Sequence, residues 1–148
     1  MSKKIVLILI ITFFITGCIN NKTEKVYLTD KYYNKGELIT VNKTDIENLT
    51  NETYVVYTYN NFCNLPIHCE TIFKKVMEKY HLDFLAIPYS EFKDTFIHET
   101  VSYAPSIIIV HNKDIIAYLD ANKDSDMDKY QDAIEFENWI NNYIYLNK

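Results

Sequence analysis

The sequence contains no arginine, and all 15 of its basic residues are lysines. It therefore has no planar guanidinium fork with which to bind a phosphate or carboxylate through paired hydrogen bonds. Glycine is also scarce, since Gly17 and Gly36 are the only two, so neither the dinucleotide-binding pattern nor the P-loop pattern can be written along the chain. The formal net charge is -5, which is the wrong sign for a nucleic-acid-binding domain. We therefore expect no nucleic-acid partner.

The composition is otherwise that of a globular protein. The chain has 148 residues, of which 48% are hydrophobic and 24% are charged. These values are ordinary for a folded chain, and the length corresponds to about one domain.

The first eighteen residues read as an export signal. Lys3 and Lys4 precede an apolar run from Ile5 to Ile15, which is too short to cross a bilayer as a helix but fits the core of a signal peptide. The run ends in Ile-Thr-Gly-Cys at Cys18, which resembles a lipobox, the site at which lipoproteins are cleaved before a diacylated cysteine. That resemblance implies a signal peptide over residues 1–17, a lipidated Cys18 and a protein held at the extracytoplasmic face of the cell membrane. The alternatives are an uncleaved anchor and a plain secretory signal.

The cysteine content then leaves one pair. The chain has three cysteines, and a lipidated Cys18 leaves Cys63 and Cys69. Outside the cytoplasm, two such cysteines are more often oxidised than free.

Beyond Cys18 the sequence predicts a tether and an α/β domain. Residues 18–36 are rich in Asn, Lys, Thr and Tyr without a sustained period, and we expect them to form a tether, with some order near Val26–Leu28. From Glu37 onward, β-branched or apolar runs alternate with segments of helical period. The predicted strands are 37–41, 53–59, 83–88, 107–110 and 114–119, and the predicted helices are 44–49, 69–80, 90–98 and 126–146. Strands separated by helices imply parallel pairing, and a turn at Asn112-Lys113 implies a final antiparallel hairpin.

This order resembles the thioredoxin fold, a central mixed sheet flanked by helices. Two local features support the resemblance, which covers residues 37–146. Cysteines lie between the strand 53–59 and the following helix, where thioredoxin-like proteins carry their active site. The stretch Y103-A-P-S-I-I-I-V110 is similar to their cis-proline loop. The segments 114–120 and 136–140 are of the type found in thioredoxin-like lipoproteins and bacteriocin-transport accessory proteins of Gram-positive bacteria.

The resemblance implies a thiol–disulfide oxidoreductase that acts on exported proteins or peptides and needs no cofactor. Cys63 would attack a substrate disulfide and Cys69 would resolve the mixed disulfide, with the reverse assignment as an alternative and with His68 tuning the thiolate. Ala104 and Pro105 would form the platform on which a client strand pairs with the backbone. The simpler interpretation of Pro105 is that it merely begins a strand.

The cysteine spacing departs from the family. Five residues separate Cys63 from Cys69 where thioredoxins have two, and the strand Tyr54–Tyr59 lacks the usual acidic residue. Two other interpretations therefore stay open. The pair is a permanent disulfide in a redox-inert binding or accessory module, or Cys63, His68 and Cys69 bind a metal with His81 or His98. The metal interpretation is the weakest, because the spacing fits no standard zinc signature, and we expect no metal. The sequence does not indicate the oligomeric state.

Overall fold

The computed structural model describes residues 24–60 and 68–148. The predicted signal peptide, Cys18 and Cys63 lie outside these residues. Within them, no helix is both long enough and apolar enough to cross a membrane.

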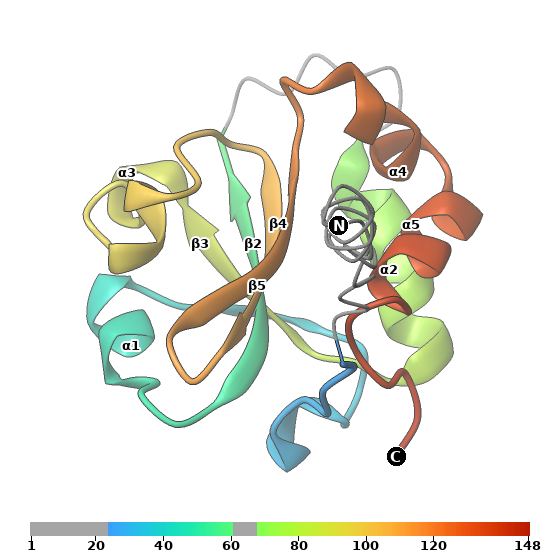
Figure 1. Cartoon of the computed structure of the whole chain (residues 1–148), viewed down its shortest axis with the longest axis horizontal. Helices are drawn as coiled ribbons and strands as arrows, with labels where there is room; N and C mark the ends of the chain where they lie inside the picture. The colour runs from blue at the N-terminus through green and yellow to red at the C-terminus, as the bar shows by residue number, and fades with distance from the viewer. Residues whose placement is uncertain (1–23, 61–67) are drawn as a thin grey trace, which may run out of the picture.

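Five strands form one mixed sheet with the order β1-β3-β2-β4-β5 (Figure 1). The strands are β1 (Leu38–Thr40), β2 (Thr53–Tyr59), β3 (Phe84–Pro88), β4 (Ser106–His111) and β5 (Asp114–Asp120). The first three are parallel to one another, while β4 is antiparallel to β2 and β5 is antiparallel to β4. This is the mixed arrangement that the alternation of strands and helices predicts.

Helices cover both faces of the sheet (Figure 1). The helices α1 (Lys43–Asn48) and α3 (Tyr89–Phe92) lie on one face. On the other face lie α2 (Cys69–Tyr80), α4 (Met127–Gln131) and α5 (Ala133–Ile140), which also pack against one another. Three short 3-10 helices complete the described elements: η1 (Asp30–Tyr32), η2 (Phe96–Glu99) and η3 (Asp124–Asp126).

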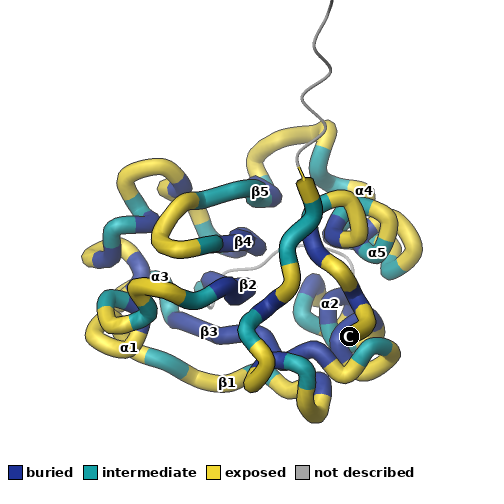
Figure 2. Tube along the Cα trace, turned by 60° about the horizontal axis from the view of Figure 1, so that its bottom comes forward, coloured by how far each residue is buried: buried dark blue, intermediate teal, exposed yellow. Residues whose placement is uncertain are grey.

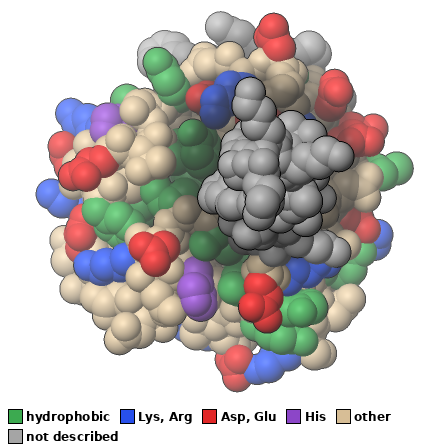
Figure 3. All heavy atoms as spheres, in the orientation of Figure 1, with side chains coloured by type: hydrophobic (Ala, Val, Ile, Leu, Met, Phe, Trp, Pro, Cys, Tyr) green, Lys and Arg blue, Asp and Glu red, His purple; other side chains and the backbone are tan. Residues whose placement is uncertain are grey.

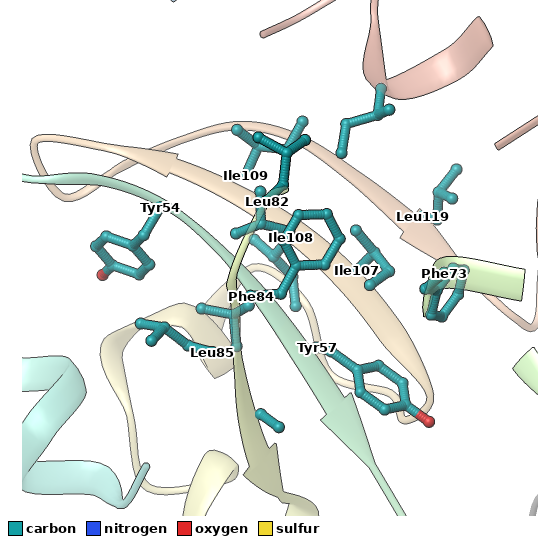
Figure 4. Close-up of a cluster of buried hydrophobic side chains, with 14 of the residues drawn as sticks. Tyr54, Tyr57, Phe73, Leu82, Phe84, Leu85, Ile107, Ile108, Ile109 and Leu119 are labelled. Carbon is teal, nitrogen blue, oxygen red and sulfur yellow. The ribbon is translucent and has the colours of Figure 1, made fainter. Parts of the chain in front are cut away.

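The central strands are buried on both faces (Figure 2). This explains why β2 and β4 read as nearly continuous apolar runs instead of alternating. Figure 4 shows the cluster around them, in which Phe73 from α2 and Leu119 from β5 lie at the same end as Ile107. The ring of Tyr57 borders this cluster, and its hydroxyl points away from the aliphatic side chains (Figure 4).

Local signals in the sequence account for several element boundaries. Asn42 begins α1 with a capping box, because its side chain accepts from the Asp45 amide while the Asp45 carboxylate accepts from the Asn42 amide. The β4–β5 hairpin turns at Asn112 and Lys113, both with positive φ (51° and 71°). Two consecutive left-handed residues suit the right-handed twist of the strands, and the predicted hairpin is confirmed.

Two predicted helices are shorter than expected. The segment 90–98 divides into α3 and η2, because Thr95 adopts an extended conformation and its hydroxyl donates to the carbonyl of Phe92. The segment 126–146 divides at Asp132, which is extended (φ -129°, ψ 124°) and begins a new helix by accepting from the amides of Ile134 and Glu135. The prediction of one continuous helix in each segment was wrong.

The part of the expected tether that the structure describes, residues 24–36, is packed on the domain. Leu28 and Tyr32 are each only 2% exposed and belong to the core. Val26 bridges to Ile144 in parallel orientation, and the amide of Thr29 donates to the carbonyl of Thr53. The folded part of the chain therefore extends N-terminally beyond Glu37.

A buried carboxylate closes the turn between this segment and β1. Asp83 is 2% exposed and accepts from the side chain of Asn34 and from the amides of Lys35, Gly36 and Glu37. At Gly36 (φ 79°) an added Cβ would lie 2.7 Å from the carbonyl oxygen of Met77. Only glycine fits both this conformation and this close approach.

Candidate functional site

The cysteine that the structure describes begins helix α2. Cys69 is the first residue of the helix and follows His68, which occupies the N-cap position and is exposed. The Cys69 side chain is fully buried. The N-terminus of a helix presents unpaired amides and a partial positive charge, an environment that favours a thiolate.

A tyrosine of the neighbouring strand lies against the sulfur. The Oη of Tyr57, on the face of β2 that α2 covers, is 3.6 Å from the Sγ of Cys69, and either atom can be the donor. The Tyr57 ring packs edge-on against Phe73 of the same helix, with ring centroids 5.5 Å apart. This contact holds the ring in place and aims its hydroxyl at the start of α2.

The predicted proline loop begins β4 beside the end of β2. The Ala104-Pro105 peptide bond is cis, as the resemblance implied. Asn60, which follows β2, donates from Nδ2 to the carbonyl of Ala104 at 2.9 Å. The hydroxyl of Ser106 donates to the carbonyl of Tyr103 at 2.7 Å. The loop is thus fixed from both sides, and Tyr103 at its tip is 55% exposed.

Tyr130 of α4 connects this loop to the cysteine. Its hydroxyl donates to the carbonyl of Pro105 at 3.1 Å, and the side chain is fully buried. Burial is the main cause of the raised pKa of Tyr130, and the neighbouring Cys69 is the next largest. The phenol therefore stays protonated at neutral pH and is close enough to Cys69 for the two groups to interact electrostatically.

The two carboxylates near Tyr130 belong to β5 and η3, and neither belongs to β2. Asp120 and Asp126 also raise the pKa of Tyr130. Asp120 ends β5 opposite Ser106 and is 8% exposed, and its amide donates to the Asp126 carboxylate at 3.1 Å. The acidic residue that thioredoxins carry in the strand before the cysteines has no counterpart in β2, so these carboxylates lie on a different side of the site.

A hollow of about 290 Å³ opens beside Tyr57. Its lining residues come from β1, β2, β3 and the first turns of α2: Leu38, Thr40, Tyr57, Tyr59, Glu70, Lys74 and Ala86. The Glu70 and Lys74 side chains form an ion pair of 2.7 Å there. Tyr57 itself is only 2% exposed, so the hollow reaches little of the ring that contacts the cysteine.

The structure thus brings some predicted residues together and separates others. Cys69 contacts Tyr57 and lies near Tyr130, which binds the carbonyl of Pro105. Ala104 is bound by Asn60, and Cys63 lies outside the described residues. His81 ends α2 (81 - 69 = 12 residues from Cys69), about 18 Å along the helix axis, so it cannot share a metal with that cysteine. His98 Nε2 lies 3.3 Å from the hydroxyl of Tyr89. Over residues 24–60 and 68–148, no three His, Cys, Asp or Glu side chains come close enough to hold a metal ion.

Sequence reasoning missed three residues of the site, namely Tyr57, Asn60 and Tyr130. The two tyrosines read as ordinary core positions, and the strand alternation that places Tyr57 on the helix-covered face was the one usable signal. Nothing local to Tyr130 connects it with Cys69, because the contact depends on how α4 docks.

Comparison with known proteins supports the fold alone. No family model matches the chain, and no curated protein matches its sequence. Among solved structures, a thioredoxin from Schistosoma mansoni aligns at 20% identity over 75% of this chain and 99% of its own, with a TM-score of 0.51. A thioredoxin variant from Halobacterium salinarum aligns at 14% identity over 74% of this chain and 93% of its own, with a TM-score of 0.56. The chain therefore has a thioredoxin-like α/β fold.

Proposed function

We propose that the chain is a membrane-anchored, extracytoplasmic thiol–disulfide oxidoreductase that acts on exported proteins or peptides through Cys63 and Cys69. The observation that carries the proposal is the contact chain around Cys69. The cysteine begins a helix, touches Tyr57, and lies beside Tyr130, which binds the cis-proline loop. We also propose that the protein is related to the thioredoxin-like lipoproteins and bacteriocin-transport accessory proteins of Gram-positive bacteria, on the likeness of its segments 114–120 and 136–140.

The exchange proceeds in two balanced steps. The Cys63 thiolate attacks one sulfur of a client disulfide, forming a mixed disulfide and releasing the first client thiolate. The Cys69 thiolate then attacks the Cys63 sulfur, which closes the Cys63–Cys69 disulfide and releases the second client thiolate. The client gains two electrons, and an external dithiol must reduce the enzyme again. An oxidised enzyme meeting a dithiol client runs the same steps in reverse.

The Ala104 backbone would position the client. Its carbonyl is held by Asn60, whereas its amide has no partner among the described residues. An extended client segment would accept a hydrogen bond from this amide, in the manner of an added strand. The exposed ring of Tyr103 offers apolar surface next to that contact.

A trapping experiment tests the exchange. The Cys69→Ser variant cannot resolve a mixed disulfide, so it should accumulate client proteins linked through Cys63 that are released by a reductant. The matched Cys63→Ser variant should trap no client and should lose insulin reduction. If neither variant traps a client and both reduce insulin as the parent does, exchange through this pair is ruled out. Cys69→Ala provides a second form should a buried serine prevent folding.

A redox-inert accessory module is the second candidate. Two observations favour it: Cys69 is fully buried, and β2 supplies no carboxylate to move a proton from it. In this case the Cys63–Cys69 bond is structural, and the surface of the proline loop binds peptides without chemistry. The reduction potential separates the candidates, because a structural disulfide lies below about -300 mV and an exchanging one lies near the values of known oxidoreductases.

A further inference from the structure

The first described residues are attached firmly to the last ones. The Val26 amide donates to the Tyr143 carbonyl at 2.9 Å, and the Tyr145 amide donates to the Val26 carbonyl at 3.0 Å. The hydroxyl of Tyr33 binds both sides, donating to the Tyr145 carbonyl and accepting from the Leu28 amide. Since Leu28 is also buried, this segment cannot lengthen the tether without breaking core contacts.

Only a short stretch of chain remains for a tether. Between Cys18 and Glu24 lie five residues (23 - 18 = 5), and even full extension spans only about 20 Å from one to the other. If Cys18 carries lipid, the surface around Glu24 must therefore lie close to the bilayer. This step rests on the lipid anchor of the proposed function.

That surface carries two exposed tyrosines, one exposed lysine (Lys148) and one half-buried lysine (Lys25). The rings of Tyr27 and Tyr145 stack with centroids 4.3 Å apart, although they are 53% and 40% exposed. The ammonium of Lys25 lies 5.8 Å from the Tyr145 ring centroid, and the ammonium of Lys148 pairs with Asp30. Tyrosine rings and lysine stems are the side chains that lie comfortably at a lipid headgroup layer. We call Lys25, Tyr27, Tyr145 and Lys148 the anchor face.

The anchor face lies at the opposite end of the sheet from the cysteine site. Thr29 is joined to Thr53, the first residue of β2, by two hydrogen bonds of 2.9 Å. The Asn60–Ala104 contact follows the last residue of the same strand. Seven residues of strand separate the two ends by about 20 Å, and Figure 1 shows residues 24–36 at the bottom of the view and the start of β4 toward the top.

We propose that the anchor face rests on the surface of the lipid bilayer and that the site at Cys69 and Ala104 points away from it. The tyrosine pair enters the headgroup layer, and the two lysines meet its phosphates. The domain is then oriented by its membrane contact, and clients are reached from the aqueous side.

The oxidation rates of the tyrosines test this orientation. The lipidated chain, which begins at Cys18, is reconstituted into phosphatidylcholine vesicles that contain phosphatidylglycerol, and tyrosine oxidation by hydroxyl radicals is mapped by mass spectrometry. Tyr103, which is 55% exposed at the far end, is the matched internal control. The reference is the same chain from residue 18 onward with Cys18→Ala and no lipid, mixed with the same vesicles.

The reactivity of Tyr27 and Tyr145 relative to Tyr103 should fall roughly threefold or more on the vesicles, because the rings leave water. If the chain floats with the vesicles but the three tyrosines keep their reference reactivity, the orientation is overturned while the anchor stands. If the lipidated chain does not float with vesicles, the anchor fails and the orientation with it.

Discussion

Two phenols lie near the Cys69 sulfur. Tyr57 is 3.6 Å away, and Tyr130 is near enough for the cysteine to raise its pKa. Burial keeps the Tyr130 hydroxyl protonated, and this hydroxyl donates its hydrogen bond to the Pro105 carbonyl. The Tyr57 hydroxyl is then the phenol able to donate to a Cys69 thiolate. A neutral donor stabilises a thiolate less than a cation does, so the Tyr57 hydroxyl would activate Cys69 only modestly in its proposed resolving role.

Tyr57→Phe tests this role at the scale of one hydroxyl. The ring and its packing on Phe73 remain, so unfolding in urea should change little. The step in which Cys69 resolves a mixed disulfide should slow by up to about tenfold, since one hydrogen bond to the thiolate is lost. Stopped-flow measurement of thiol release from a mixed disulfide with Cys63 reports this step. Tyr59→Phe is the control on the same strand, and an equal slowing in both variants would contradict the role of Tyr57.

At the scale of elements, sequence patterns predicted those parts of the fold that depend on burial. The run Thr53–Tyr59 and the run Ile107–Val110 form central strands because both of their faces are covered. The apolar spacing from Cys69 to Tyr80 forms one helix with one buried face. These patterns are set by contact with the core as a whole, so they do not depend on any particular neighbour.

Element boundaries were harder to predict, because single polar side chains decide them. Thr95 ends a helix by bonding to the Phe92 carbonyl, and Asp132 begins one by capping two amides. The apolar spacing continues through both positions, so periodicity alone extends each helix too far. Threonine and aspartate compete with the helical backbone in this way wherever they have room.

Asp132→Ala tests the capping of α5. The variant leaves the amides of Ile134 and Glu135 without their acceptor, and the free energy of unfolding should fall by about 1 kcal/mol. Urea denaturation measures the change. Asn142→Ala, at an exposed position beyond the helix, is the control and should have little effect. A loss as large in the control as in Asp132→Ala would argue against the cap.

The contact between α2 and α5 should depend on pH. Lys79 donates to both carboxylate oxygens of Glu137, and Tyr80 donates to one of them. The hydrogen bond from Lys79, followed by that from Tyr80, lowers the pKa of Glu137 below its usual value. A carboxyl whose pKa is lower in the folded state contributes stability above its unfolded-state pKa and loses it as the pH falls through the folded-state value.

Glu137→Gln should therefore be less stable than the parent at neutral pH, and the difference should shrink in acid. The effect should be small and should weaken with salt, because the lysine is exposed. Thermal unfolding across the acid range measures it. Glu135→Gln, exposed on the same helix, should run parallel to the parent, and a Glu137→Gln difference that persists in acid would contradict the assignment.

At the scale of the whole molecule, the site is assembled from four separate elements. Tyr57 lies on β2, Cys69 begins α2, Pro105 precedes β4 and Tyr130 lies on α4. The resemblance of local motifs identified the cysteines and the proline from the sequence. The contact of Tyr130 with Pro105 could not be identified in this way, because it arises only when α4 docks against the sheet. Charge gives no further guidance, because acidic and basic side chains are interspersed over the described part of the face in Figure 3.

Residues 24–36, which precede β1, pack as part of the folded domain, whereas the sequence indicated a domain that begins at Glu37. Its composition is that of a linker, yet Leu28 and Tyr32 complete the core and the backbone at residues 35–37 satisfies the buried carboxylate of Asp83. Burial of two large side chains contributes about 4 kcal/mol. A small domain is stable by only about 5–15 kcal/mol, so this segment accounts for a large share of the stability.

Two truncated chains test this share. A chain that begins at Glu24 keeps every contact of the segment and should unfold cooperatively in urea. A chain that begins at Glu37 loses Leu28 and Tyr32, removes the donors of Asn34, Lys35 and Gly36 to Asp83, and turns the fourth donor, the Glu37 amide, into the N-terminal amino group. Its unfolding midpoint should fall sharply or its transition should broaden, because a buried carboxylate that has lost three of its four described donors adds a penalty to the lost apolar burial. Equal midpoints for the two chains would mean that residues 24–36 are a tether after all. The free chain between Cys18 and the domain would then be longer, and it would no longer force the anchor face to lie close to the membrane.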